Sequence, residues 1–267
     1  MTAQRPRIGV FDSGVGGLTV LKALLELVPE ADYLYFGDTA RLPYGSKSAA
    51  TVTHYALGAA HYLENHGAEM LVIACNTASA LALESIAKGA PVPVLGVIEP
   101  GAERAAAETK NGKVVVIGTE ATVASHAYAK ALASRGLGAR EKACPLLVPL
   151  VEEGWTEHTV TEQVARIYLG EAFSGFESAD VLVLGCTHYP LLKPLLRRVA
   201  PPHVSIVDSA ESTAKAVAAK LRKRASAAND SPRLKFFATD SVEKFRRLGA
   251  RFLGRTVEDV EHVDLKE

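Results

Sequence analysis

Residues 181–190 read "VLVLGCTHYP", and this stretch raises the first question about the fold. Four aliphatic residues predict a buried strand, yet the run ends at once in glycine, cysteine, threonine and histidine. The same pattern occurs at residues 71–79, "LVIACNTAS", where an apolar run again stops at a cysteine followed by a hydrogen-bonding residue. Because ligands of open α/β sheets gather at the carboxyl ends of strands, both cysteines are predicted at a ligand-binding edge.

Short apolar runs alternate with longer segments of helical pattern along the whole chain. This alternation is typical of parallel sheets wrapped by helices, so an α/β fold is predicted. The predicted strands are residues 7–11, 32–36, 70–74, 92–97, 113–118, 179–185, 204–208 and 235–239. The polar, breaker-rich segment 221–233 predicts an exposed loop.

An internal similarity relates the two halves of the chain. Residues 7–17, "RIGVFDSGVGG", predict a strand ending in Asp-Ser-Gly, and residues 113–122, "KVVVIGTEAT", predict one ending in Gly-Thr. The first of these strand ends precedes Cys75 by nearly the same interval that separates the second from Cys186. Two copies of one α/β plan would give this spacing. Any doubly wound protein also repeats its strands at such intervals, so both interpretations stay open.

Composition bounds the class of protein. A chain of 267 residues with 48% hydrophobic and 22% charged residues is typical of a globular protein with one large domain or two smaller ones. Thirty basic residues balance thirty acidic ones, so neither nucleic acid nor a membrane is expected as a partner. The N-terminus lacks the apolar core of a signal peptide, and no apolar run is long enough to span a bilayer. A cytoplasmic location is therefore expected.

The cysteine count argues against disulfides and metals. The three cysteines are Cys75, Cys144 and Cys186, and so small an odd number without a secretion signal predicts free thiols. No CxxC pair or HExxH is present, and Cys186 with His188 gives too few ligands, so no metal site is expected. Cys144 is followed by Pro145 rather than by a polar residue and is interpreted as structural.

The glycine-rich segment 12–17, "DSGVGG", resembles a phosphate-binding turn but fails in detail. A dinucleotide fingerprint beginning at Gly14 requires glycine where Thr19 stands, and a P-loop beginning at Gly9 requires lysine where Val15 stands. No nucleotide cofactor is therefore expected. Either the backbone N–H groups bind a small anion such as a carboxylate, or the segment is only a tight turn.

Each strand-end cysteine taken alone fits simple packing, since free cysteine is among the most buried residue types. A cysteine just before a helix also lies in the positive potential of the helix N-terminus. That potential stabilises the thiolate and predicts a thiol pKa lowered toward neutrality. Two such thiols flanking one carbon could take a proton from one face and deliver another to the opposite face. A lone nucleophilic Cys186 with His188 would instead indicate acyl transfer, in which Cys75 has no role.

The chain closely resembles the glutamate racemases of the cofactor-independent amino-acid racemase superfamily. The similar segments are residues 8–21, 36–48, 74–79, 96–102, 114–125, 144–154 and 185–192. The resemblance implies two similar α/β domains related by a pseudo-twofold axis, each a mostly parallel sheet flanked by helices, with the active site in the cleft between them. Residues 1–97 with 208–267 would form the first domain and residues 98–207 the second.

The resemblance also implies an activity, the interconversion of L- and D-glutamate without a cofactor, and a role in supplying D-glutamate for peptidoglycan. It implies that the protein is a homodimer. Cys75 and Cys186 would be the two acid–base residues, with Asp12 assisting the first and Glu152 and His188 the second. Substrate contacts would come from Asp12, Ser13, Pro43, Tyr44, Gly45, Asn76, Thr77, Thr119, Thr122, Thr187 and His188.

Alternatives stay open at two levels. Among the residues, Asn76 could only cap a helix, Thr119 could only end a strand, and Glu152 could form a solvated ion pair. Among the functions, an aspartate racemase differs by one methylene in its substrate, a cysteine hydrolase would use Cys186 and His188, and a small-anion-binding protein would have no activity.

Overall fold

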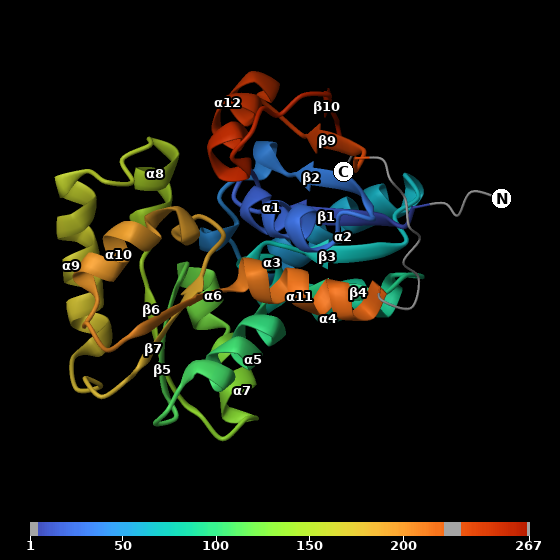
Figure 1. Ribbon diagram of the computed structural model, residues 1–267. Coiled ribbons are helices and arrows are strands. Elements are labelled where there is room, and N and C mark those ends of the chain that lie inside the picture. Colours follow the sequence, from blue (N-terminus) through green and yellow to red (C-terminus); the bar gives the residue numbers. More distant parts are fainter. Residues whose placement is uncertain (1–4, 222–230, 266–267) are drawn as a thin grey trace.

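The computed structural model describes residues 5–221 and 231–265, whose strands form two parallel sheets (Figure 1). The first sheet has the order β10-β9-β2-β1-β3-β4 and the second the order β6-β5-β7-β8. The strands are β1 (Arg7–Asp12), β2 (Asp32–Gly37), β3 (Met70–Ile73), β4 (Val94–Gly96), β5 (Lys113–Gly118), β6 (Gly138–Ala143), β7 (Val181–Gly185), β8 (Ser205–Asp208), β9 (Leu234–Ala238) and β10 (Val260–His262). Every strand pair is parallel, which confirms the predicted α/β fold.

The first four strands of each sheet follow one plan. In the first sheet they lie in the order β2-β1-β3-β4, and in the second the corresponding strands lie in the order β6-β5-β7-β8. Nearly equal spacing along the chain could arise by chance, but the same spatial order of strands is a further agreement. The topology therefore favours the interpretation as two copies of one plan.

Two strands were not predicted from the sequence. Both β6, "GAREKA", and β10, "VEH", lie at an edge of their sheet. An edge strand has a single neighbour and is less buried, so its sequence need not be continuously apolar. Of the loop predicted over residues 221–233, residues 222–230 lie outside the described residues.

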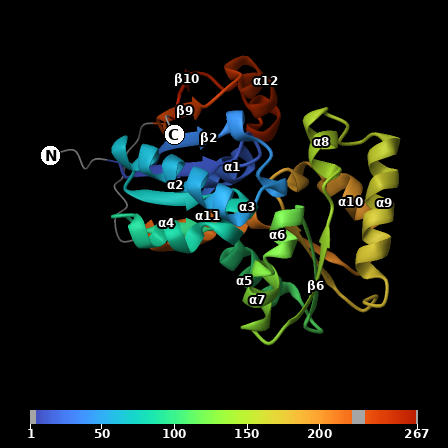
Figure 2. The same ribbon diagram turned by 180° about the vertical axis from the view of Figure 1, so that it is seen from behind.

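Helices cover both sheets (Figures 1 and 2). They are α1 (Leu18–Leu27), α2 (Ala49–Asn65), α3 (Asn76–Leu81), α4 (Leu83–Gly89), α5 (Ile98–Glu108), α6 (Glu120–Ala124), α7 (Ala127–Ala133), α8 (Leu147–Glu152), α9 (Thr159–Phe173), α10 (Lys193–Val199), α11 (Ser209–Leu221) and α12 (Val242–Leu253), with the short 3-10 helices η1 (Thr39–Arg41), η2 (Tyr44–Ser46) and η3 (Tyr189–Leu192). The largest apolar core runs continuously from the first sheet to the second, so the two sheets are held as one packed body.

The end of the chain returns to the first sheet. Strand β9 pairs with β2, and α12 packs against α1, although about two hundred residues separate these elements in the sequence. Figure 1 shows this red segment lying above the blue strands. Helix α11 packs against both α1 and α5 and so connects the two halves.

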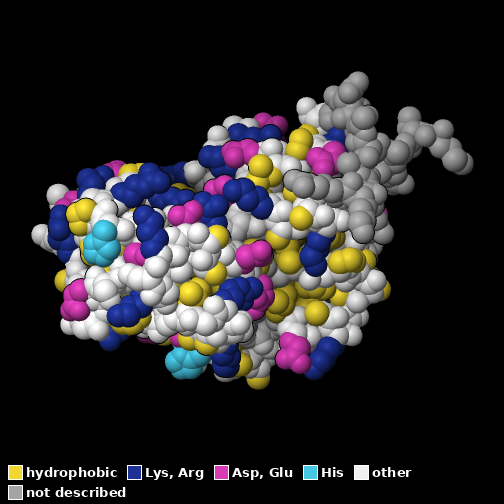
Figure 3. All heavy atoms as spheres, turned by 60° about the horizontal axis from the view of Figure 1, so that its bottom comes forward, with side chains coloured by type: hydrophobic (Ala, Val, Ile, Leu, Met, Phe, Trp, Pro, Cys, Tyr) yellow, Lys and Arg dark blue, Asp and Glu magenta, His cyan; other side chains and the backbone are white. Residues whose placement is uncertain are grey.

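The molecular surface is mixed in charge. On the face shown in Figure 3, acidic and basic side chains are interspersed with apolar and uncharged ones. No helix within residues 5–221 and 231–265 has both the length and the apolar character needed to cross a membrane.

Candidate active site

A cavity of about 400 Å³ lies where the carboxyl ends of the two sheets meet. Four strand ends supply residues to it: Ser13 follows β1, Cys75 follows β3, Thr119 follows β5 and Cys186 follows β7. The complete lining is Ser13, Leu42, Pro43, Tyr44, Gly45, Ser46, Cys75, Asn76, Thr77, Thr119, Glu120, Pro145, Val148, Pro149, Glu152, Cys186, Thr187, His188 and Lys244. Its volume suits a small ligand.

Two of the predicted site residues lie behind the cavity wall rather than in it. Asp12 is buried and accepts hydrogen bonds from the Gly14 N–H at 2.8 Å and the Thr187 hydroxyl at 3.4 Å. Thr122 places its hydroxyl oxygen 2.9 Å from that of Thr119. Both residues therefore support groups that line the cavity. The other predicted residues all line it.

Seven lining residues were not predicted, namely Leu42, Ser46, Glu120, Pro145, Val148, Pro149 and Lys244. All but Lys244 fall inside the segments that resemble the racemases, so the signal for them was their position in those segments. Lys244 is one of several cations on an amphipathic helix, and nothing in its sequence surroundings distinguishes it.

Cys75 caps helix α3 through its sulfur. Its Sγ accepts from the Ala78 N–H at 3.5 Å and donates to the Ser13 hydroxyl oxygen at 3.6 Å. Burial, followed by the nearby carboxylate of Asp12, raises the pKa of the Cys75 thiol to about 12. The expectation of a lowered thiol pKa is therefore wrong for Cys75, because the short helix α3 does not offset the loss of water.

On the opposite side, Cys186 begins a chain of polar contacts. Its Sγ lies 4.0 Å from His188 Nδ1, and His188 Nε2 lies 3.2 Å from Glu152 Oε1. Burial alone would lower the pKa of His188, but its bonds to Cys186 and Glu152 raise that pKa to about 10. The bond from His188 lowers the pKa of Glu152. Glu152 thus pairs with a buried imidazolium, in addition to a longer contact with Lys244.

Asn76 provides an unused hydrogen-bond donor. Its side-chain oxygen accepts from the Tyr128 hydroxyl at 2.7 Å, while its Nδ2 is buried with no hydrogen-bond partner within the described residues. The side-chain cap of α3 is Cys75, so helix capping does not explain Asn76. A buried donor without a partner is rare in native proteins and is suited to an acceptor on a ligand.

Three threonine hydroxyls meet at the boundary between the sheets. The Thr77 hydroxyl oxygen lies 2.9 Å from that of Thr119 and 3.1 Å from that of Thr122. Thr119 also caps α6 by accepting from the Thr122 N–H. Its role is therefore both a helix cap and a part of the cavity wall. Figure 2 shows α6 facing α3 between the two halves.

Tyr44 is buried and held by a side-chain hydrogen bond. Its hydroxyl donates to Asp38 Oδ2 at 2.6 Å, and the same buried carboxylate accepts from Thr239 and Arg41. The ring is 1% exposed. Asp38 lies within the segment 36–48 but was not predicted, because it acts by holding Tyr44 and does not itself line the cavity.

Two glycines allow the halves to approach each other closely. A Cβ at Gly16 would lie 2.2 Å from the Thr187 hydroxyl oxygen, and a Cβ at Gly45 would lie 2.7 Å from Thr119 Cβ. A side chain at either point would require the opposing side chains or the local backbone to move. The glycine-rich segment 12–17 is therefore needed for close contact between the halves.

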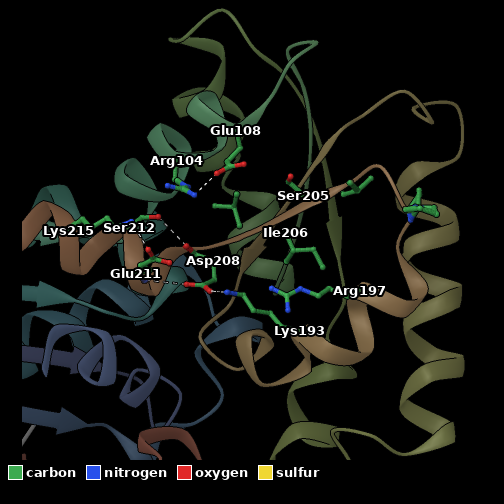
Figure 4. Close-up of a pocket in the computed structure, with 14 residues that line it drawn as sticks. Arg104, Glu108, Lys193, Arg197, Ser205, Ile206, Asp208, Glu211, Ser212 and Lys215 are labelled. Carbon is green, nitrogen blue, oxygen red and sulfur yellow. Dashed lines mark hydrogen bonds and ion pairs between the residues drawn. The ribbon is translucent and has the colours of Figure 1, made fainter. Parts of the chain in front are cut away.

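A second cavity, of about 470 Å³, lies beside β8 and helices α5, α10 and α11 (Figure 4). Six of its charged side chains form ion pairs: Lys193 with Asp208, Lys215 with Glu211, and Arg104 with Glu108. It is lined by no cysteine or histidine. Nor does the described part of the chain hold a cluster of three or more His, Cys, Asp or Glu side chains suited to a metal ion. The acid–base groups therefore gather in the first cavity.

Comparisons with known proteins agree with this geometry. The model of the Asp/Glu/hydantoin racemase family matches residues 8–217. A glutamate racemase of Koribacter versatilis is 62% identical over 99% of this chain and 99% of its own. Among solved structures, a glutamate racemase of Francisella tularensis in complex with D-glutamate has a TM-score of 0.90 at 35% identity, covering 98% of each chain. One of Thermus thermophilus, in complex with β-chloro-D-alanine, has a TM-score of 0.88 at 46% identity, also covering 98% of each chain.

The fold, the paired thiols and the family match together define the class as amino-acid racemases, which are isomerases. With full-length relatives at this level of identity, the chain belongs to the glutamate racemases of the Asp/Glu/hydantoin racemase family. The resemblance seen in the sequence is confirmed.

Proposed function

We propose that the protein interconverts L- and D-glutamate without a cofactor, with Cys75 and Cys186 exchanging the roles of base and acid at the α-carbon. One observation carries the proposal: two thiols from equivalent strand ends of two similar sheets line one small cavity. Inversion needs a proton removed from one face of the carbon and another delivered to the opposite face. Each positioned acid–base group contributes roughly 10²–10⁴-fold to the rate.

The groups around each thiol suit this exchange. His188 is placed to receive the proton of Cys186 or return it, and Glu152 balances the imidazolium charge. On the other side, the pKa of about 12 favours the thiol form of Cys75, so in one direction of the reaction Cys186 removes the α-proton and Cys75 then donates one to the opposite face. Asp12 lies beside Cys75 and, because burial raises its pKa, can hold a proton more readily than an exposed carboxyl.

Hydrogen-bond donors must offset the charge that develops on the α-carboxylate, since no cofactor serves as an electron sink. The unpartnered Nδ2 of Asn76 is the strongest candidate, and the hydroxyls of Ser13, Thr77 and Thr187 are further donors. Pro43, Tyr44 and Gly45 close one wall of the cavity around the substrate. The two sides of the cavity would come from two domains, one formed by residues 1–97 with 208–267 and the other by residues 98–207.

The cellular part of the proposal is that a cytoplasmic homodimer supplies D-glutamate for peptidoglycan. It is supported by membership of the glutamate racemases. The Francisella relative was solved with D-glutamate, which supports glutamate as the substrate over aspartate.

One experiment tests the activity. The protein is incubated in D₂O with L-glutamate, and separately with D-glutamate and L-aspartate, without added cofactor. Chiral chromatography and NMR of the α-position follow inversion and deuteration. We expect deuterated product from both glutamate enantiomers and at least tenfold slower turnover of aspartate. If neither glutamate enantiomer gains deuterium at the α-position, the proposal is contradicted.

The chain Cys186–His188–Glu152 also has the composition of a cysteine hydrolase site, which is the second candidate. That function gives Cys75 no role. It predicts an acyl-enzyme on Cys186 that mass spectrometry can trap with activated esters, and no α-deuteration of glutamate.

A further inference from the structure

Helix α12 touches the Cys186 side of the active site at three points on one of its faces. Lys244 Nζ lies 3.8 Å from Glu152 Oε2, and Arg251 Nη1 donates to the Glu152 backbone oxygen at 3.3 Å. The ring of Phe252 packs edge-on against that of His188, with centroids 5.0 Å apart. Because Lys244 and Arg251 are seven residues apart, about two helical turns, both project from the same face.

These contacts join α12 to the candidate acid–base group. The two oxygens of Glu152 are divided between two cations, since Oε1 faces His188 and Oε2 faces Lys244. Lys244 also lines the cavity. A change at Lys244 therefore alters the charge that Glu152 presents to His188, which in turn contacts Cys186.

We propose that Lys244 is a positioning residue that holds the Glu152 carboxylate and thereby sets the pH at which His188 and Cys186 exchange protons. The proposal rests on the two-cysteine reaction proposed above. It extends the site to a helix of the C-terminal segment, to which no role was assigned from the sequence.

Other charged and titratable groups act on the same chain of contacts. Those that face Cys186, His188 or Glu152 are Asp12 at the end of β1, Cys144 after β6, Tyr128 on α7, Tyr189 on η3, and Lys244 and Arg251 on α12. Among the described residues, Lys244 is the cation of α12 whose ammonium pairs with the Glu152 carboxylate. It can therefore be changed without touching the thiols or the imidazole.

The sign of the effect follows from electrostatics. The ammonium of Lys244 repels a proton on His188 directly and also draws the Glu152 charge away from it. Removing the ammonium therefore strengthens proton binding by the His188–Cys186 pair, and the pair loses its proton at higher pH. The side chain of Lys244 is 54% exposed, so we expect a shift of about 0.5 pH unit, which weakens as salt is added.

The test uses the full chain with Lys244→Met, Lys244→Arg and the control Arg247→Met, an exposed cation on the same helix. Alkylation by iodoacetamide is measured against pH, and peptide mass spectrometry reads each cysteine separately. In Lys244→Met we expect the Cys186 profile to move up by about 0.5 pH unit while the Cys75 profile stays in place. In Lys244→Arg, which keeps the positive charge, and in Arg247→Met we expect the Cys186 profile of the wild type. An unchanged Cys186 profile, or an equal movement of Cys75, would overturn the proposal.

Kinetics give a second readout. Free L- and D-glutamate have equal energy in water, so kcat/KM is equal in both directions for every variant. For Lys244→Met we expect the acid limb of the pH profile of kcat to move to higher pH. At a given pH on that limb kcat would then fall about threefold, with KM changed less than twofold. A raised KM with unchanged kcat would show that Lys244 binds glutamate and would overturn the positioning role. If the wild-type protein does not racemise glutamate, the proposed function fails, while alkylation still decides the role of Lys244.

Discussion

At the scale of single residues, the two thiols differ in their surroundings. Cys75 is bounded by Ser13 and Ala78, and its partner carboxyl Asp12 is buried, whereas Cys186 faces an imidazole paired with Glu152. The two thiols that we propose as equivalent bases therefore lie in unequal surroundings. In the proposed reaction an asymmetric site can still catalyse both directions, because each thiol would act on one face of the substrate.

Replacing either thiol should stop inversion. We expect Cys75→Ser and Cys186→Ser each to lower racemisation by at least about 10²-fold, because a serine hydroxyl is a far weaker acid–base group than a thiol. Residual α-exchange in D₂O, followed by NMR, should be confined to one enantiomer in the first variant and to the opposite enantiomer in the second. Cys144→Ala is the control, since Cys144 lies outside the cavity and should keep turnover within about threefold. Full activity in either serine variant would contradict the two-base reaction.

At the scale of elements, the strand ends that form the site could be predicted from the sequence. The apolar runs stop just before Cys75, Thr119 and Cys186. Because a buried parallel strand is apolar along its whole length, the polar residues that follow such a run mark the carboxyl end of the strand. Edge strands such as β6 were not readable, since their burial depends on the neighbouring strand. Lys244 was not readable either, because its proximity to Glu152 arises only when the chain end returns to the first sheet.

The acid–base state of Cys75 could not be read from the sequence for a related reason. Its position before a helix was predicted, but the pKa depends on how completely water is removed and on the distance to Asp12. Those quantities are set by packing of several elements. Sequence pattern therefore gave the residue and its place in the fold, and the folded structure gave its chemistry.

The turn between β1 and α1 makes a prediction at the same scale. A methyl group at Gly16 would lie 2.2 Å from the Thr187 hydroxyl oxygen and 2.6 Å from His188 Nδ1. We expect Gly16→Ala to destabilise the protein by about 1–3 kcal/mol and to lower kcat/KM at least tenfold, because the turn or His188 must move. Urea unfolding and steady-state kinetics check both effects.

Gly170→Ala is the matched control. This glycine lies inside α9, and a Cβ there would meet no atom within 4 Å. We expect unchanged kinetics and a gain of about 0.5–1 kcal/mol, since alanine is the better helix former. Wild-type stability and turnover in Gly16→Ala would show that the close contact between the halves is not needed.

At the scale of the whole molecule, the site should make stability depend on pH. The pKa of His188 rises from an ordinary value of 6.5 to about 10 in the folded protein, because Cys186 and Glu152 outweigh the effect of burial. A raised folded pKa means that the folded state holds the proton more strongly than the unfolded chain. Its stabilising effect is therefore complete below about pH 6.5 and is lost as pH rises through about 10.

Two of the thiols, Cys75 and Cys144, act at higher pH than His188. Burial raises the pKa of Cys75 and of Cys144 from 9.0 to about 12, so the unfolded chain releases these protons first, and stability falls further above pH 9. Between pH 6.5 and 9 we expect the free energy of unfolding to fall by as much as about 1.4 kcal/mol per pH unit, the limit for one proton. Urea titrations across this range should show the slope in the wild type and a flatter profile in His188→Asn. His126→Asn, which removes an imidazole with a 66% exposed side chain, is the control. An equal slope in wild type and His188→Asn would mean that the folded protein does not hold the imidazole as a cation, and the proposed role of Glu152 in balancing an imidazolium charge would have to be abandoned.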